Sequence, residues 1–377
     1  MRLNTSRTRS QQELAMKLGV QPVTQVGLLT WERKRLLIHA AKTALAATLC
    51  WWLALRFGLH DGYWGAISAI IVLQSNVGAT ISASRDRIVG TIIGAGLGFT
   101  FSLFGSVPWN YVCAVFAAII VCGLLGFRSS SRLAGVTITI IMLVQSNSRK
   151  ALAFDRVLQV VLGIVIAVIV ITVVFPDRAR LALRDGLAQE SLLLGSFFEA
   201  ILSGFRGARA ESIETLRADA LALLRGNNQL LQAARNEPSG GPGWREGLAL
   251  LAESERAIFD SLVALELAIK DSAGDGYAEQ LEPMLGNLAN DIHSGFHYVA
   301  GCIHKWQFNV PPPNLHLEED IALLEQRMAQ LRHKGREFSQ AEILRAYAVQ
   351  LHLKQLARLL RAARVETSRA VGQIQAT

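Results

Sequence analysis

Basic side chains inside or beside apolar segments are the residues of this sequence best suited to chemistry. Lys42 lies within the apolar segment Leu36–Leu55, three residues after His39 and on the same helical face. A charge well inside a membrane span costs about 2.5–3.5 kcal/mol on insertion scales, so such residues usually face a bundle interior. Lys42 is therefore predicted to attract a carboxylate in a polar pathway, with His39 beside it. The alternative is that Lys42 extends toward a membrane surface.

Arginines precede two further apolar segments. Arg85 and Arg87 come before Ile88–Leu103. A guanidinium group recognises a carboxylate through two parallel hydrogen bonds, so these two are predicted to form a cytoplasmic funnel for anions. The outward equivalents would be Arg149, Lys150 and Arg156. Alternatively these residues fix the orientation in a membrane, or Arg87 pairs with Asp86 or Asp155.

The elements that must position these residues are apolar segments that all precede Pro176. Hydrophobic residues make up 51% of the 377-residue chain and charged residues 18%, which is unusual for a soluble protein. Since a span needs about 20 mostly apolar residues, we predict six membrane helices, some trimmed at polar ends: Leu36–Leu55, Trp64–Gln74, Ile88–Leu103, Tyr111–Phe127, Leu133–Ser146 and Val157–Phe175. The predicted fold is all-α: a polar segment 1–34, a six-helix transmembrane domain 35–176 and a cytoplasmic α-helical domain 177–377.

The six predicted spans contain a repeated pattern. IIVLQSN around Gln74 and IMLVQSN around Gln145 each precede an Asp-Arg pair that opens a long apolar helix. Three spans per repeat give inverted halves related by a pseudo-two-fold axis in the membrane plane. Both middle spans are short and end in polar side chains, and interrupted helices in a membrane line cavities. The predicted pathway residues are therefore His39, Lys42, Trp64, Gln74, Asn76, Arg85, Arg87, Gln145, Asn147, Arg149 and Arg156.

A second pattern concerns packing. Gly90, Gly94 and Gly98 recur every four residues after a predicted loop that holds Arg85–Arg87. Small residues at that spacing let membrane helices approach closely. A nucleotide-binding interpretation of the glycines is rejected because no strand precedes them.

The chain after Pro176 is polar and helical in pattern, with five or six helices separated by Gly- and Pro-rich segments. His293, His297 and His304 share one helical face, which is predicted to be a polar bundle face rather than a metal site. The four cysteines form no disulfide pattern. No cofactor or metal is predicted.

The net charge of +8 has a simple explanation in membrane topology. Basic residues cluster on the side of the N-terminus, so the positive-inside rule places both termini in the cytoplasm. No basic stripe interleaved with aromatic residues is present, which argues against nucleic-acid binding.

Tyr63-Trp64, Gln74 and the order Arg87, Gly90, Thr91, Gly94 resemble the fusaric-acid-resistance and aromatic-acid-exporter family, and distantly the plant aluminium-activated malate transporters. The resemblance implies a bacterial inner-membrane protein that exports organic anions and is not an enzyme. Larger members carry two such membrane blocks, so it also implies a homodimer. The sequence departs from the family pattern at Asn76, near which proline is common, and at Gly65, where alanine is commoner.

The pathway residues together with the family resemblance predict a protein embedded in the lipid bilayer. Its predicted function is the efflux of small aromatic carboxylates, driven by an ion gradient. Two alternatives stay open at this point. One is a passive anion channel gated by the cytoplasmic helices, and the other is a membrane scaffold that transports nothing.

Overall fold

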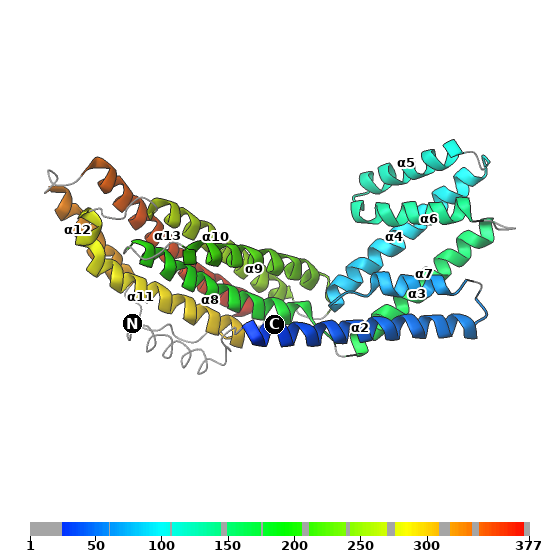
Figure 1. Ribbon diagram of the computed structural model, residues 1–377, viewed down its shortest axis with the longest axis horizontal. Coiled ribbons are helices and arrows are strands. Elements are labelled where there is room, and N and C mark those ends of the chain that lie inside the picture. Colours follow the sequence, from blue (N-terminus) through cyan, green and yellow to red (C-terminus); the bar gives the residue numbers. More distant parts are fainter. Residues whose placement is uncertain are drawn as a thin grey trace. The chain divides into compact units, whose positions relative to one another are not determined.

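The computed structural model describes residues 25–59, 61–105, 108–144, 149–174, 176–205, 211–238, 242–269, 276–308, 317–333 and 339–372. These residues form twelve α-helices and one short 3₁₀ helix, and they contain no β-strand (Figure 1). The predicted all-α class is confirmed. The helices belong to two compact units. The N-terminal unit comprises Val23–Ala179 and Ala233–Pro238, and the C-terminal unit comprises Arg180–Gln232 and the chain from Ser239 onward.

The N-terminal unit holds one helix for each predicted apolar segment. They are α2 (Gln25–Arg56), α3 (Tyr63–Val72), α4 (Val77–Ser102), α5 (Pro108–Leu124), α6 (Ser131–Leu143) and α7 (Arg149–Val173). Among the described residues, Leu36–Arg56 of α2 and Lys150–Val173 of α7 are long and apolar enough to cross a membrane. Helices α3 and α5 are apolar but shorter.

Helix α4 begins about three turns earlier than predicted, so the expected loop at Arg85–Arg87 is wrong. Asn76 caps the helix, because its side-chain oxygen accepts a hydrogen bond from the Ala79 amide at 2.9 Å. The hydroxyls of Thr80 and Ser84 then donate to carbonyl oxygens one turn back. These bonds satisfy the polar side chains within the helix, and the polar segment is therefore helical.

The two triplets α2–α4 and α5–α7 pack by the same pattern. Helix α3 contacts α2 and α7, as α6 contacts α5 and α4, and α4 and α7 contact each other. A Cβ on Gly94 would lie 2.5 Å from the Ala134 oxygen and 2.8 Å from the Thr137 Cβ. A Cβ on Gly163 would likewise collide with the Gly65 oxygen and lie 2.8 Å from the Ser68 Cβ. The second contact repeats the first at a constant offset of 69 residues.

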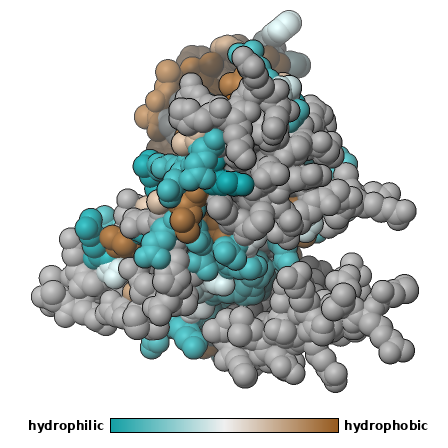
Figure 2. All heavy atoms as spheres, turned by 90° about the vertical axis from the view of Figure 1, so that its left-hand side faces the viewer, coloured by the Kyte–Doolittle hydropathy of each residue, from teal (hydrophilic) through white to brown (hydrophobic). Residues whose placement is uncertain are grey.

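The surfaces of the two units differ in composition. On the N-terminal unit, large apolar side chains are exposed along α2, α5 and α7, among them Trp51, Trp52, Trp109, Phe116, Leu124 and Phe154. Apolar surface on this scale marks an interaction with lipid or protein. The C-terminal unit exposes few such residues. In Figure 2 hydrophilic residues in teal occupy much of its described surface, with isolated hydrophobic residues between them.

The C-terminal unit contains α8 (Ala179–Phe205), α9 (Glu211–Arg235), α10 (Pro242–Ile269), α11 (Gly276–Lys305), α12 (Leu317–His333) and α13 (Gln340–Gly372). Aromatic contacts join its helices: Phe197 of α8 meets Phe259 of α10, and Phe198 of α8 meets Phe296 of α11. Helix α13 packs along α10 and also contacts α11 and α12. The predicted helical character of this half is confirmed.

Candidate functional site

Two arginines of the N-terminal unit converge on the short helix α3. Arg87 of α4 donates a hydrogen bond from Nη2 to the Ser68 hydroxyl at 3.2 Å. The Arg156 guanidinium of α7 lies over the Trp64 ring, 3.7 Å from its centroid. Trp64 and Ser68 are one turn apart on α3, so both guanidinium groups lie at a similar level along this helix. They are close enough to repel each other.

Both arginines are buried, at 1% exposure for Arg87 and 2% for Arg156. Five of their side-chain nitrogen atoms have no hydrogen-bond partner among the described residues. These are Nε and Nη1 of Arg87 and all three nitrogens of Arg156. A buried charge is costly unless it is paired and hydrogen-bonded. Arginine cannot lower this cost by releasing a proton, because a guanidinium group stays protonated in proteins. The arrangement is therefore suited to an anion that accepts several of these hydrogen bonds.

Small residues bring α7 close enough for the stacking of Arg156 on Trp64. Gly163 of α7 lies directly against the backbone of Gly65 and Ala69 on α3. A Cβ on Gly65 would in turn lie 2.8 Å from the Cys50 sulfur of α2. The glycine at position 65, a departure from the family pattern, thus stands where three helices meet beside Trp64.

The described residues of the second triplet form no equivalent site. At the constant offset of 69 residues, Leu133 is the position equivalent to Trp64, and Thr137 is equivalent to Ser68. The Thr137 hydroxyl donates to the Leu133 carbonyl of its own helix at 2.9 Å. The packing of the two halves is alike, but both arginines reach toward α3.

Lys42 lies elsewhere in the same unit and has a partner. Its side chain is 1% exposed, and Nζ is 2.9 Å from Oδ2 of Asp177, whose side chain is 45% exposed. The Asp177 carbonyl accepts a hydrogen bond from the Val77 amide at 3.1 Å. Asp177 thus ties α2 to the beginning of α4. His39 is half-buried one turn earlier, and its Nδ1 has no hydrogen-bond partner among the described residues.

The polar residues between α3 and α4 bond to nearby backbone. The Gln74 side chain donates to the Ile71 carbonyl at 3.0 Å, and Asn76 is the cap of α4. Both therefore shape the break between the two helices. Gln145 and Asn147 lie outside the described residues, as does the side chain of Arg149.

The remaining predicted residues lie on α4. Arg85 is exposed and its guanidinium lies 5.4 Å from the centroid of the Phe127 ring. Gly90, Gly94 and Gly98 face α6, where a Cβ on each would meet Leu133, Ala134 and Ile138 respectively. At Gly90 and Gly94 the added atom would be 2.7 Å and 2.5 Å from backbone oxygens of Ser130 and Ala134.

Sequence reasoning missed three contributors. Ser68 binds Arg87, and its position one turn after Trp64 was the available signal. Asp177 pairs with Lys42 across 135 residues, which no local pattern indicates. The segment Ala233–Pro238 belongs to the N-terminal unit, where Glu237 accepts the Ala179 amide and the Ala233 carbonyl lies against Gly78.

The C-terminal unit has its own buried like-charge pair, formed by Glu190 of α8 and Glu255 of α10. Asn227 of α9 donates a hydrogen bond to Glu190 at 2.7 Å. Burial raises the pKa of Glu190 to about 7, although the bond from Asn227 lowers it. Burial and the neighbouring Glu190 raise the pKa of Glu255 well above its ordinary value. The pair is therefore suited to hold a proton.

The histidines predicted to share a face separate into two environments. His293 and His297 of α11 meet through their Nε2 atoms at 3.1 Å, and His293 Nδ1 lies 3.9 Å from Glu199. His304 instead faces Asp185 at 3.7 Å. No group of three or more metal-ligating side chains occurs in the part of the chain that the structure describes.

Comparison with known proteins identifies the family. The fusaric acid resistance protein family matches residues 36–376. The chain belongs to this family. It is also similar to the inner membrane protein YccS of Escherichia coli (strain K12), with 24% identity over 301 residues, 78% of this chain and 39% of YccS. The chain thus spans well under half the length of this relative.

The family assignment decides the coarse predictions. The chain is confirmed as a membrane protein of a broadly transport-related family. The relative is an inner membrane protein, in agreement with the expected location.

Proposed function

We propose that this protein transports small aromatic carboxylates out of the cell across the inner membrane, with Arg87 and Arg156 as the anion-binding pair. The observation that carries the proposal is the burial of two guanidinium groups that both contact α3, with five nitrogen atoms lacking partners among the described residues. A carboxylate placed between them would accept these hydrogen bonds and offset the repulsion. Charge-assisted bonds of this kind are about twice as strong as neutral ones.

The geometry gives each residue a task. Trp64 holds the face of the Arg156 guanidinium by a cation–π contact, which leaves the N–H groups at its edge for a carboxylate. Ser68 occupies only Nη2 of Arg87. Lys42 is proposed to line the pathway when its ion pair with Asp177 breaks. The other residues proposed to line the route are His39, Gln74, Asn76, Arg85, Gln145, Asn147 and Arg149.

The proposed membrane architecture is six spans in two inverted repeats. The matching contacts of Gly94 and Gly163 support this arrangement, because one constant offset relates both the glycines and their partners. Both termini are placed in the cytoplasm by the positive-inside rule. Arg87 and Arg156 do not count in that rule, since they meet at one level of α3 and cannot mark opposite membrane surfaces.

Transport requires a second conformation. At 1% and 2% exposure neither arginine lines an open channel in this structure, so the protein is proposed to alternate between this closed form and forms open to either side. A homodimer is proposed on the family resemblance alone, because larger members carry two such membrane blocks.

Flux in liposomes tests the proposal. Purified protein is reconstituted, and uptake of labelled hydroxybenzoate is followed with and without a pH gradient. Accumulation against the concentration gradient only when the pH gradient is present supports a driven exporter. Dissipative flux alone would replace it by the passive channel, and no flux at all would leave the scaffold.

A further inference from the structure

The exposed aromatic side chains of the N-terminal unit gather at one end of its helices. In Figure 1 the ends of α2, α4 and α6 and the beginnings of α3, α5 and α7 lie on the right of this unit. Seven aromatic residues with exposures of 49–74% lie within five residues of these helix ends, namely Trp51, Trp52, Phe57, Tyr63, Phe104, Trp109 and Phe154. Five residues are about 7.5 Å along a helix. One further exposed aromatic residue, Phe116, lies about 10 Å beyond Trp109 on α5.

The opposite end of the same helices exposes aliphatic side chains instead. Leu36 and Leu37 at the beginning of the apolar part of α2, Leu124 at the end of α5 and Val173 at the end of α7 are 66–83% exposed. Phe127, which follows α5 at this end, is half-buried. Aromatic and aliphatic surface residues of the described chain are therefore separated by level along the helices.

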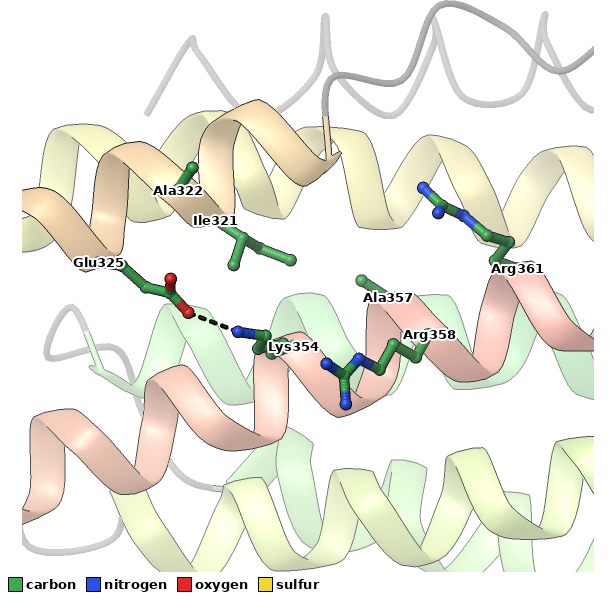
Figure 3. A pocket seen from close by; sticks show the side chains of 7 residues that line it. All are labelled: Ile321, Ala322, Glu325, Lys354, Ala357, Arg358 and Arg361. Atoms are coloured by element: carbon green, nitrogen blue, oxygen red, sulfur yellow. Dashed lines mark hydrogen bonds and ion pairs between the residues drawn. The ribbon is translucent and has the colours of Figure 1, made fainter.

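The aromatic surface is a property of the N-terminal unit. Among the described side chains of the C-terminal unit, Tyr347 is the one exposed aromatic residue, at 37%. Figure 3 shows charged side chains along the pocket between α12 and α13, where Lys354 donates a hydrogen bond to Glu325 at 2.6 Å. A surface of charged groups and ion pairs is suited to water, whereas the exposed aromatic rings are suited to a less polar medium.

The boundary between lipid headgroups and acyl chains is the medium that such residues prefer. Tryptophan and tyrosine are enriched there, because their rings are apolar at one end and hydrogen-bonding at the other. The two helices long enough to cross a membrane end or begin at this level, since their apolar parts are Leu36–Arg56 and Lys150–Val173. Arg56 and Lys150 are exposed, and a lipid phosphate is a strong acceptor for their N–H groups.

The arginine pair lies close to the level of these aromatic residues. Arg156 follows Phe154 by two residues on α7, and Trp64, on which Arg156 stacks, follows Tyr63 at the beginning of α3. Ser68, the partner of the other arginine, lies about 7 Å further along α3. The hydrocarbon core of a bilayer is about 30 Å thick, so its midplane lies about 15 Å from either boundary. Both contacts of the pair are thus nearer to the aromatic end than to a midplane.

We propose that the seven aromatic residues form a belt at the boundary between the headgroups and acyl chains of the outer leaflet, and that the arginine pair lies within this leaflet, directly beneath the belt. Binding sites between inverted repeats usually lie near the midplane, so this site would be off-centre. An anion held there would be about 20 Å from the cytoplasmic boundary and only one to two helical turns from the outer one.

The parts of this proposal have different foundations. The belt rests on the exposed residues alone. That its leaflet is the outer one, and that the pair binds the transported anion, rest on the proposed topology and function.

Depth measurements with spin labels test the belt. The full chain, with its four cysteines replaced by alanine, receives one new cysteine at a time and is reconstituted in vesicles of phosphatidylethanolamine and phosphatidylglycerol. Electron paramagnetic resonance then compares how oxygen and a water-soluble nickel chelate reach the label. The label of Trp109→Cys is expected at the headgroup boundary. The matched control is Phe116→Cys on the same helix, whose label is expected about 10 Å deeper.

The depth of the arginine pair is read from Phe154→Cys, with Tyr63→Cys as a second reading on α3. Both labels are expected within about 5 Å, one helical turn, of the Trp109 level. A Phe154 label as deep as the Phe116 label would overturn the shallow position of the pair, and equal depths for Trp109 and Phe116 would overturn the belt. A Trp109 label that neither oxygen nor the chelate reaches would mean that a second copy, and not lipid, covers this face. These depths are measured without a ligand, so they can fail or hold independently of the hydroxybenzoate flux that tests the transport proposal.

Discussion

Two buried pairs of like charges, one in each unit, differ in how they can become neutral. Glu190 and Glu255 in the C-terminal unit can hold a proton, and burial raises the pKa of both. Arg87 and Arg156 in the N-terminal unit keep their charges, because a guanidinium does not deprotonate in proteins. A bound proton therefore reduces the buried charge of the glutamate pair, whereas the charge of the arginine pair can be balanced only by an anion.

The largest expected effect comes from removing the arginine charges. Arg87→Met or Arg156→Met should lower carboxylate flux about 100-fold or more, since loss of one buried charge partner costs about 2–5 kcal/mol. Thermal stability should stay equal or rise, because an apolar side chain replaces an uncompensated charge. Flux in liposomes and thermal unfolding followed by tryptophan fluorescence measure the two effects.

The control for the arginines is Arg132→Met, which changes an exposed arginine of α6 outside the proposed route. It should leave most of the flux intact. A marked fall in stability of the Arg156 variant, with flux preserved, would mean that the arginine pair is a structural element and would remove the contrast with the glutamates.

The glutamate pair gives the next largest effect, a dependence of stability on pH. The folded pKa of Glu190 is about 7 against an ordinary 4.5. Its contribution is full below about pH 4.5 and is lost as pH rises to about 7, by about 3 kcal/mol in total. Glu190→Gln should flatten this part of the stability curve, measured by hydrogen exchange of core amides in α8 and α10. Glu253→Gln, an exposed neighbour of Glu255, should keep the slope; the same slope in both variants would refute the assignment.

Trp64 distinguishes the two halves of the N-terminal unit. Replacing it by the residue at the equivalent position, Trp64→Leu, removes a cation–π contact worth about 1–2 kcal/mol when desolvated. Carboxylate affinity should fall about tenfold, as calorimetric titration would show. Leu133→Met in the other half should change the affinity little. Equal losses in both variants would show that the site is not confined to the α3 side.

The smallest effect is expected at Lys42, a buried cation whose counter-ion lies within the chain. Lys42→Met and Asp177→Asn break the same partly exposed ion pair, which is worth about 1 kcal/mol or less. Each should reduce flux by a similar small factor, about threefold or less. If Lys42→Met abolishes flux while Asp177→Asn does not, Lys42 contacts the anion directly and belongs with the arginines.

The sequence indicated most of the helices because their apolar segments are long and clearly bounded. The prediction misplaced the beginning of α4. The segment around Arg85–Arg87 is polar, so counting apolar residues excluded it from the helix. Hydrogen bonds within the helix, which composition does not record, satisfy those polar side chains. The six helical segments and the presence of two arginines beside them were thus predictable. That the two arginines meet at the same level of α3 was not.

The residue order by itself determined an all-α membrane protein of the fusaric acid resistance family, because apolar length and glycine spacing are local properties. Tertiary structure alone decided which charges meet. Arg87 and Arg156 are 69 positions apart and come together on α3, while Lys42 finds Asp177 across 135 residues. Electrostatic energy depends on distance in space and on burial, and both are set only when the helices pack.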